Sequence, residues 1–430
     1  MLRSLAAFKR NANKVVPVRR HRPMYQIALY MGLLLMLGLV VMYALGPQRA
    51  NVLNYAYGTH YDSNFFFNKQ LASVIIAIAA FAICALLPLK WVNKYAKQIF
   101  FTGLVLCVLL VIMGAVLHLP IAKDTNGAYR WFYLGQLGSL QPSELLKYGV
   151  LVFLAGFLSK RVKQEKINDM QETLVPVAVL AGISLIVVVF LQKDLGTGMS
   201  LVAIIMAMLV VSGMDGKIIA KVLGAVLILG VLMIAMSPHR IERVVTFLQG
   251  DSRRSASQDD GDYHIQQARI AIGSGGLLGL GIGKSVQATG YLPEAINDSI
   301  FAVMGETFGF LGLMAILALF TALLLSILRV SARLPDMRLR LAAAGVFGWV
   351  ASHVIMNIAA MTGVAPLTGI PLPLLSYGGT SMMFIAAALG LVFQISRYTS
   401  HKPLEEGSDG KNLSGRRRFG RTRYASGSRI

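Results

Sequence analysis

The stretch Met24–Leu45, MYQIALYMGLLLMLGLVVMYAL, runs for 22 residues without a charged side chain. A bilayer core of about 30 Å requires roughly 20 apolar residues in a helix, so this stretch is long enough to span a membrane. Similar runs recur along the chain, which has 430 residues, 55% of them hydrophobic and only 14% charged. Because backbone polar groups in hydrocarbon must be satisfied within their own segment, these runs predict an all-α, polytopic membrane bundle.

The apolar runs predict about ten transmembrane helices. One predicted outer loop, 237–299, lies between helices seven and eight and is far longer than the others, and loops of that length usually carry function. The first run follows a basic segment, as in a signal peptide, but no small-residue cleavage site follows it, so we expect an uncleaved helix. The predicted spans are Met24–Leu45, Leu71–Leu87, Ile99–Leu117, Ser143–Leu158, Leu174–Leu191, Gly196–Ser212, Ile218–Met236, Ile300–Ile327, Leu341–Ala360 and Ser376–Ile395.

The basic residues are distributed unevenly along the chain. With the N-terminus in the cytoplasm, 29 of the 41 Lys and Arg residues fall in tails, in inner loops or, for Lys221, at the inner end of a span, 11 fall in outer loops, and Lys147 lies inside a span. This excess predicts that both termini are cytoplasmic. The basic C-terminal tail is either a topology anchor or a segment attracted to anionic lipid or to a cytoplasmic partner, and we expect no nucleic-acid partner for the net charge of +21. The predicted parts are a basic tail at 1–23, a membrane domain at 24–397 and a basic, disordered tail at 398–430.

Two acidic residues stand at the start of the eighth predicted span. Residues 290–306 read GYLPEAINDSIFAVMGE, which places Glu294 and Asp298 just before the apolar run. A carboxylate at that depth is costly unless it has a function, and partial burial would favour proton uptake, as a general base requires. The alternative is that Asp298 is an N-terminal helix cap, since Asp is favoured there and suits the helix dipole.

Two patterns precede this acidic segment within the long loop. The sequence YHIQQARIAI at 263–272 places apolar residues on one face and Gln266, Gln267 and Arg269 on the other, which predicts an interfacial helix. The glycine-rich stretch 272–284 follows, and we expect its glycines to form tight turns at the membrane surface beside a helix end. No strand precedes these glycines, so a nucleotide-binding loop is not predicted.

Seven segments together resemble the SEDS family of bacterial shape and division proteins. The resemblance covers nearly all ten predicted spans, and the long basic tails and the YLPEA loop resemble the division member more than the rod-elongation member. The segments are FFFNKQ at 65–70, QPSELLK at 141–147, DLGT at 194–197, RIERVVTFL at 240–248, IAIGSGGLLGLGIGKS at 270–285, YLPEAINDSIFA at 291–302 and TGIPLPLLSYGGTS at 368–381.

The resemblance implies a peptidoglycan glycosyltransferase that polymerises lipid II, an undecaprenyl-pyrophosphate-linked disaccharide pentapeptide, on the outer face of the cytoplasmic membrane. Its implied partners are a class B penicillin-binding protein, which crosslinks the strands, and other divisome proteins at the septum. The family's catalytic carboxylate falls on Asp298 here. A sugar hydroxyl is a poor nucleophile, so a base within hydrogen-bond reach would activate it against the anomeric carbon of the donor.

The substrate also suggests which side chains surround it. The leaving pyrophosphate develops negative charge, so we expect cations near it, either as side chains or as a divalent ion such as Mg or Mn, and no organic cofactor. For each Arg or Lys, the alternative is that it snorkels to the interface. Residues 371–379 interrupt the last span, and irregular backbone at membrane depth lines a cavity or is buried in protein. The residues expected to contact substrate are Arg240, Arg243, Glu294, Lys193, Arg130, Ser376, Tyr377 and Ser381.

Three further polar residues lie inside predicted spans. Glu144 and Lys147 are three residues apart and therefore share a helix face, which predicts a buried ion pair that holds the bundle together. Glu306 lies two helical turns beyond Asp298. It either lines the same cavity or pairs with a neighbouring polar group.

Two positions depart from the family pattern. Lys193 stands where the family usually has a proline, and Ser299 stands where a bulky aromatic residue commonly follows the carboxylate. Neither change removes Asp298. Both affect the packing around the expected site and therefore its preference for an acceptor.

Two other classes of function remain as alternatives. The family has also been proposed to flip the lipid-linked precursor, and ten-helix bundles with polar residues at mid-depth are common among transporters. Against a transporter, the sequence shows no internal repeat and no pair of broken helices in corresponding halves. A non-catalytic scaffold of the division machinery is the third class, and it would tolerate loss of Asp298.

Overall fold

The computed structural model describes residues 22–124, 127–135, 138–235 and 260–400. The compact unit Arg19–Thr399 contains all of these residues except Ser400. A second unit comprises residues 1–18 and 400–430, and of these only Ser400 lies within the described ranges. Nearly all residues of the two predicted cytoplasmic tails also lie outside the described ranges.

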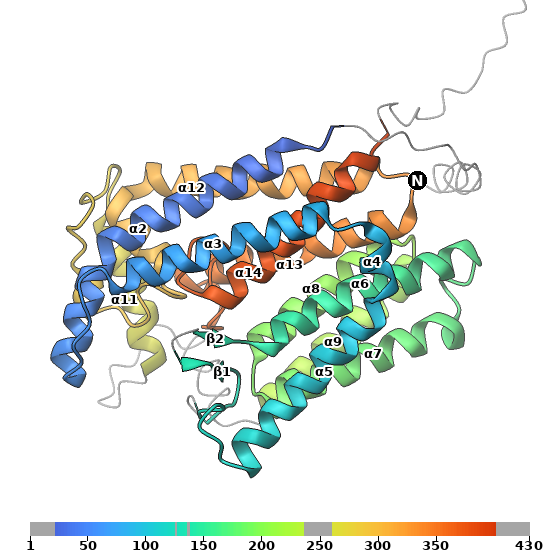
Figure 1. Ribbon diagram of the computed structural model, residues 1–430, viewed down its shortest axis with the longest axis horizontal. Helices are drawn as coiled ribbons and strands as arrows, with labels where there is room; N and C mark the ends of the chain where they lie inside the picture. Colours follow the sequence, from blue (N-terminus) through green and yellow to red (C-terminus); the bar gives the residue numbers. More distant parts are fainter. Residues whose placement is uncertain (1–21, 125–126, 136–137, 236–259, 401–430) are drawn as a thin grey trace, which may run out of the picture. The chain divides into compact units, whose positions relative to one another are not determined.

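The described residues are almost entirely helical (Figure 1). The long helices are α2 (Tyr25–Tyr57), α3 (Phe65–Leu86), α5 (Ala96–Val111), α6 (Pro142–Lys163), α7 (Val175–Leu185), α8 (Leu195–Val211), α9 (Gly216–Ala235), α12 (Ile300–Arg333), α13 (Met337–Met361) and α14 (Gly379–Ile395). The smaller elements are α4 (Leu89–Lys94), α11 (Asp260–Ser274), π-helical turns at Ile112–Val116, Met170–Leu174 and Ile186–Leu191, and 3-10 turns at Gln287–Thr289 and Ser396–Tyr398. Two short antiparallel strands, β1 (Phe132–Tyr133) and β2 (Ser139–Leu140), complete the described structure.

Each predicted span coincides with one of the long helices. Within the described ranges, seven helical segments are long and apolar enough to cross a membrane, namely Tyr25–Tyr57, Phe65–Leu86, Ala96–Val116, Met170–Leu191, Ile300–Arg333, Met337–Met361 and Gly379–Tyr398. The other three predicted spans are α6, which carries several charged residues, the 17-residue α8, and α9. The predicted all-α, polytopic membrane bundle is therefore confirmed.

Helices α13 and α14 lie in the interior of the bundle. Their most apolar windows are 72% and 78% buried, whereas the window in α3 is only 22% buried. Helix α14 packs along α3, and α13 packs along α8 (Figure 1). The peripheral helices expose Leu, Ile and Phe side chains, as expected where lipid would cover them.

Small residues allow α5 and α6 to approach closely, as is common between membrane helices. A Cβ on Gly103 of α5 would lie 2.8 Å from the Cα of Leu146, and one on Gly149 of α6 would lie 2.7 Å from the Cα of Phe100. Neither position could take a larger residue without separating the two backbones.

Helix α12 is broken at Gly309, where φ is 66° and ψ is −167°. The glycine-rich segment 275–281 lies against the break. The N–H groups of residues 280 and 281 donate to the carbonyls of 306 and 307, and those of 310 and 311 donate to the carbonyls of 276 and 277, at 2.8–3.2 Å. The predicted tight turns are present, with positive φ at Gly276 and Gly279. The glycines also let two backbones approach closely, which the sequence analysis had not predicted.

Candidate active site

Asp298 lies half-buried immediately before helix α12. The N-cap position of that helix is occupied by Ser299, which makes no side-chain capping bond. The N-cap position that the alternative assigned to Asp298 is therefore one residue further along, at Ser299. The reason is the preceding turn, in which the carbonyl of Glu294 accepts from the N–H groups of Asn297 and Ser299 and delays the helix start to Ile300.

Asn357 of α13 fixes the backbone at Asp298. Its side-chain amide donates to the carbonyl of Asp298 at 2.7 Å and to the carbonyl of Ile370 at 2.8 Å, and the residue is only 1% exposed. A Cβ placed on Gly369 would lie 3.9 Å from Oδ2 of Asp298. The Asp298 carboxylate therefore lies beside residues 368–370, as expected if the two loops form one site.

The loop before α14 is bound to the Asp298 loop and to α3. The Tyr377 N–H donates to the carbonyl of Ile296 at 2.9 Å, and the Tyr377 ring lies 5.6 Å from that of Phe66. The Tyr377 phenol, like any tyrosine with an ordinary pKa of about 10, is protonated at neutral pH and can donate a hydrogen bond.

The two predicted serine donors differ in their surroundings. Ser376 is 3% exposed, and its hydroxyl accepts from the Leu372 N–H at 2.7 Å while its carbonyl accepts from Gln70 at 3.4 Å, so Ser376 shapes the loop. Ser381 is also buried, and its hydroxyl has no hydrogen-bond partner among the described residues. It lines a small pocket together with Pro371 and Gly378.

Glu306 binds the loop that precedes α12, and Glu294 binds a neighbour within that loop. Glu306 is 1% exposed and accepts from the Ser285 hydroxyl at 2.5 Å and from the N–H groups of Val286 and Gln287 at 3.0 and 3.2 Å. It thus pairs with neighbouring polar groups, the second of the two predicted alternatives. Glu294 is exposed, has a φ of 47° and accepts from the side chain of Asn297.

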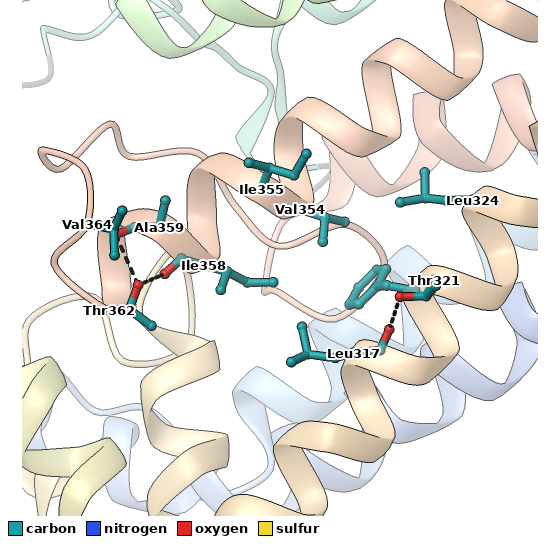
Figure 2. Close-up of a pocket in the computed structure, with 10 residues that line it drawn as sticks. Leu317, Thr321, Leu324, Val354, Ile355, Ile358, Ala359, Thr362 and Val364 are labelled. Carbon is teal, nitrogen blue, oxygen red and sulfur yellow. Dashed lines mark hydrogen bonds between the residues drawn. The ribbon is translucent and has the colours of Figure 1, made fainter.

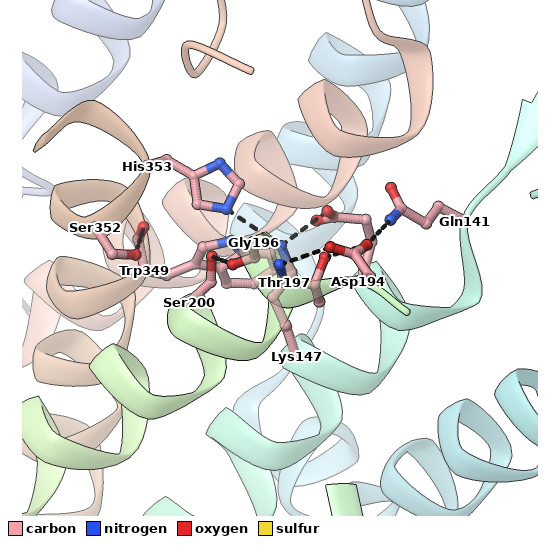
Figure 3. A network of polar contacts seen from close by, with 10 residues as sticks. Gln141, Lys147, Asp194, Gly196, Thr197, Ser200, Trp349, Ser352 and His353 are labelled. Atoms are coloured by element: carbon pink, nitrogen blue, oxygen red, sulfur yellow. Dashed lines mark hydrogen bonds and ion pairs between the residues drawn. The ribbon is translucent and has the colours of Figure 1, made fainter. Parts of the chain in front are cut away.

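The predicted ion pair between Glu144 and Lys147 is present inside the bundle. Lys147 Nζ lies 2.8 Å from Glu144 Oε1 and 3.2 Å from His353 Nε2, and it lies over the Trp349 ring at 4.9 Å (Figure 3). Asp194 lies in the same polar network (Figure 3) and caps α8. The network joins α6, α8 and α13, in keeping with the structural role predicted for the pair.

Two of the four predicted cationic contacts bind backbone carbonyls, and the other two lie outside the described residues. Arg130 donates to the carbonyls of Lys193 at 2.6 Å and Gln192 at 3.3 Å, and Lys193 donates to the carbonyl of Gly127 at 2.8 Å. Lys193 has a φ of 53°, which a proline, held near −65°, could not adopt. A proline at position 193 would therefore need a backbone conformation different from the one that Lys193 adopts. Arg240 and Arg243 lie outside the described residues.

Sequence reasoning missed His264 and Asn357. His264 of α11 is buried and lies 2.5 Å from the Ser299 hydroxyl. A signal existed for Asn357, because a polar residue stands in an apolar helix four residues after His353 and shares its face. No comparable signal connected His264 with a residue 35 positions away.

Among the described residues, no three His, Cys, Asp or Glu side chains are placed to hold a metal.

A separate hollow lies between α12 and α13 (Figure 2). Its volume is about 420 Å³ and its lining is mainly apolar, with Phe320 and Ile355 among the lining residues. The Thr321 and Thr362 hydroxyls both donate to carbonyls of their own helices. The hollow therefore offers few polar groups to a sugar or pyrophosphate, and it is not the candidate active site.

The fold and the site define a polytopic membrane protein with a carboxylate held between two irregular loops. The family model FTSW_RODA_SPOVE, described as Cell cycle protein, matches residues 25–401. This chain belongs to that family.

Named relatives and solved structures agree with this assignment. Stage V sporulation protein E of Bacillus subtilis is 34% identical over 86% of this chain and 95% of its own length. The probable peptidoglycan glycosyltransferase FtsW of Taylorella equigenitalis is 32% identical over 85% and 94%. A chain from a peptidoglycan synthase complex that coordinates polymerization and crosslinking has a TM-score of 0.69 at 23% identity and covers 88% and 99%. RodA of Thermus thermophilus has a TM-score of 0.61 at 22% identity and covers 88% and 98%.

Proposed function

We propose that this protein is a peptidoglycan glycosyltransferase that polymerises lipid II into glycan strands, with Asp298 as the general base. The observation that carries the proposal is the half-buried carboxylate of Asp298, whose backbone is fixed by Asn357 and which lies beside Gly369. The names of the FtsW relatives support the reaction class.

In the proposed reaction, Asp298 accepts the proton of a sugar hydroxyl of the acceptor. The hydroxyl oxygen forms the new bond to the anomeric carbon of the donor, and undecaprenyl pyrophosphate leaves with the electrons of the broken bond. Arg240 and Arg243 are the proposed cationic contacts for that leaving group. Ser381 and Tyr377 are the proposed donors to sugar.

A divalent cation, Mg or Mn, is proposed as a companion of the pyrophosphate. Magnesium sites commonly use one or two carboxylates together with substrate phosphates. The described residues contain no cluster that would hold such an ion without substrate. When bound, the ion would neutralise charge on the leaving group.

We further propose the orientation and partner expected from the sequence. Asp298 lies at the extracytoplasmic end of the bundle, with both termini in the cytoplasm and the protein at the division septum. A class B penicillin-binding protein is the proposed crosslinking partner. The fold shared with a chain of a peptidoglycan synthase complex supports an assembly of this kind.

The test is polymerisation by the purified protein in liposomes with lipid II, a divalent cation and a cognate class B penicillin-binding protein. We expect glycan chains from the wild type and none from Asp298→Asn or Asp298→Ala. Asp215→Asn, at an exposed position before α9, is the matched control and should polymerise normally. Full activity in the Asp298 variants would refute the assignment of the base. Translocation of lipid II without polymer would favour the transporter.

A further inference from the structure

The Ser299 hydroxyl has two partners, and together they fix the direction of both hydrogen bonds. It lies 2.8 Å from the carbonyl of Pro293, which can only accept, so the single hydroxyl hydrogen is donated there. At the 2.5 Å contact with His264, the serine oxygen must then accept, and the histidine Nε2 must carry the donated hydrogen. The structure thus contains a directed chain from His264 through Ser299 to Pro293.

Because of these two hydrogen bonds, the Ser299 hydroxyl does not cap the helix, which is the role that its N-cap position favours. A serine at an N-cap usually accepts from an N–H group in the first helical turn, yet Ser299 makes no such bond. Ser299 is fully buried and His264 is 9% exposed, so water does not readily replace either partner. The two bonds join α11, the turn at Pro293 and the start of α12.

Two hydrogen bonds from other helices act at Asp298 and at the residue after it. Its own carbonyl accepts from Asn357 of α13, and the next side chain, Ser299, accepts from His264 of α11. Two helices that are separate in the sequence therefore restrain adjacent residues. Because restraint of the backbone on both sides limits where the Asp298 carboxylate can go, such restraints favour a productive geometry.

We propose that His264 is a positioning residue for Asp298, acting through the Ser299 hydroxyl. This inference rests on the proposed function of Asp298 as the base. His264 itself takes no proton from the substrate in this proposal. A phenylalanine in place of Ser299 would have no hydroxyl for this link, so the link depends on the serine found in this sequence.

The test compares His264→Leu, His264→Gln, Ser299→Ala and the double variant His264→Leu/Ser299→Ala in the polymerisation assay. Since a misplacement of about 1 Å can cost on the order of a hundredfold, we expect His264→Leu to lower kcat by at least about tenfold with KM for lipid II unchanged. His264→Gln keeps an N–H donor and should stay within about threefold of wild type. Because both single variants break the same link, the double variant should be no slower than the slower single variant. Gln266→Leu, at an exposed position on the same helix, is the control.

Equal losses in His264→Gln and His264→Leu would overturn the proposal, because they would indicate packing alone. Losses that multiply in the double variant would also overturn it. A wild-type protein that does not polymerise, or an active Asp298→Asn, would instead refute the proposed function. Hydrogen exchange decides the inference in that case: amides 294–303 should exchange faster in His264→Leu than in His264→Gln, and equal exchange in the two variants would overturn it.

Discussion

The break in α12 provides a sharp test of how the structure is held together. Replacing Gly309 with alanine places a Cβ 2.7 Å from the carbonyl carbon and oxygen of Leu277 and still closer to the Gly279 nitrogen. These are backbone atoms, so no side chain can rotate to relieve the overlap. The segment 275–281 must move away from α12, and the four hydrogen bonds between the two must lengthen or break.

The expected cost follows from two contributions. The backbone of Gly309, at φ 66° and ψ −167°, lies in a region used almost solely by glycine, where another residue costs about 1–3 kcal/mol. Loss of two of the four hydrogen bonds, at about 1 kcal/mol each, adds roughly 2 kcal/mol. The free energy of unfolding should therefore fall by about 4 kcal/mol, a large part of the roughly 5–15 kcal/mol typical of folded proteins.

A reversible unfolding titration in mixed micelles measures this change. Gly32→Ala is the matched control, because a Cβ on Gly32 of α2 meets nothing within 4 Å. We expect no loss of unfolding free energy there, since alanine favours a helix interior over glycine. A loss below about 1 kcal/mol for Gly309→Ala, or the same loss in both variants, would refute the reasoning.

Three more predictions concern buried polar groups. Glu306→Ala leaves the Ser285 hydroxyl and two N–H groups without their acceptor and should lower the unfolding free energy by about 3 kcal/mol; a loss under about 1 kcal/mol in the same titration would contradict this. Asn357→Leu releases the backbone of Asp298 and should reduce kcat for polymerisation by at least about tenfold in a folded protein, so an unchanged kcat would exclude this positioning role. Lys147→Met leaves Glu144 as an uncompensated buried charge and should lower the unfolding free energy by about 3–5 kcal/mol. The double variant Lys147→Met/Glu144→Gln should recover at least half of that loss. No recovery would show that the buried charge is not the cause.

The parts of this structure that sequence analysis predicted depend on local periodicity. The length of each apolar run located all ten long helices, because hydrocarbon thickness fixes the number of residues needed to cross it. The spacing of Glu144 and Lys147 predicted their ion pair, since residues three apart share a helix face. The depth of the carboxylates singled out Glu294 and Asp298 together, and only the family resemblance selected Asp298.

The missed features depend on contacts between distant segments. His264 binds a residue 35 positions away, and Asn357 binds one 59 positions away. Hydropathy also could not locate the break in α12, because Gly309 lies within an apolar run that reads as one continuous span. Its geometry follows from the glycine-rich segment that packs against it, and no local pattern encodes that partner.

The surroundings of three carboxylates explain why Asp298 is a better candidate for the base than its neighbours. Glu144 is buried against Lys147, and its charge is offset there. Glu306 is 1% exposed, and its oxygens accept from three donors, which would lose their acceptor if it turned toward a substrate. A base must reach a proton on an incoming sugar, and neither residue can do so without breaking the structure. Asp298 combines a half-buried position with a fixed backbone. It therefore remains the proposed base.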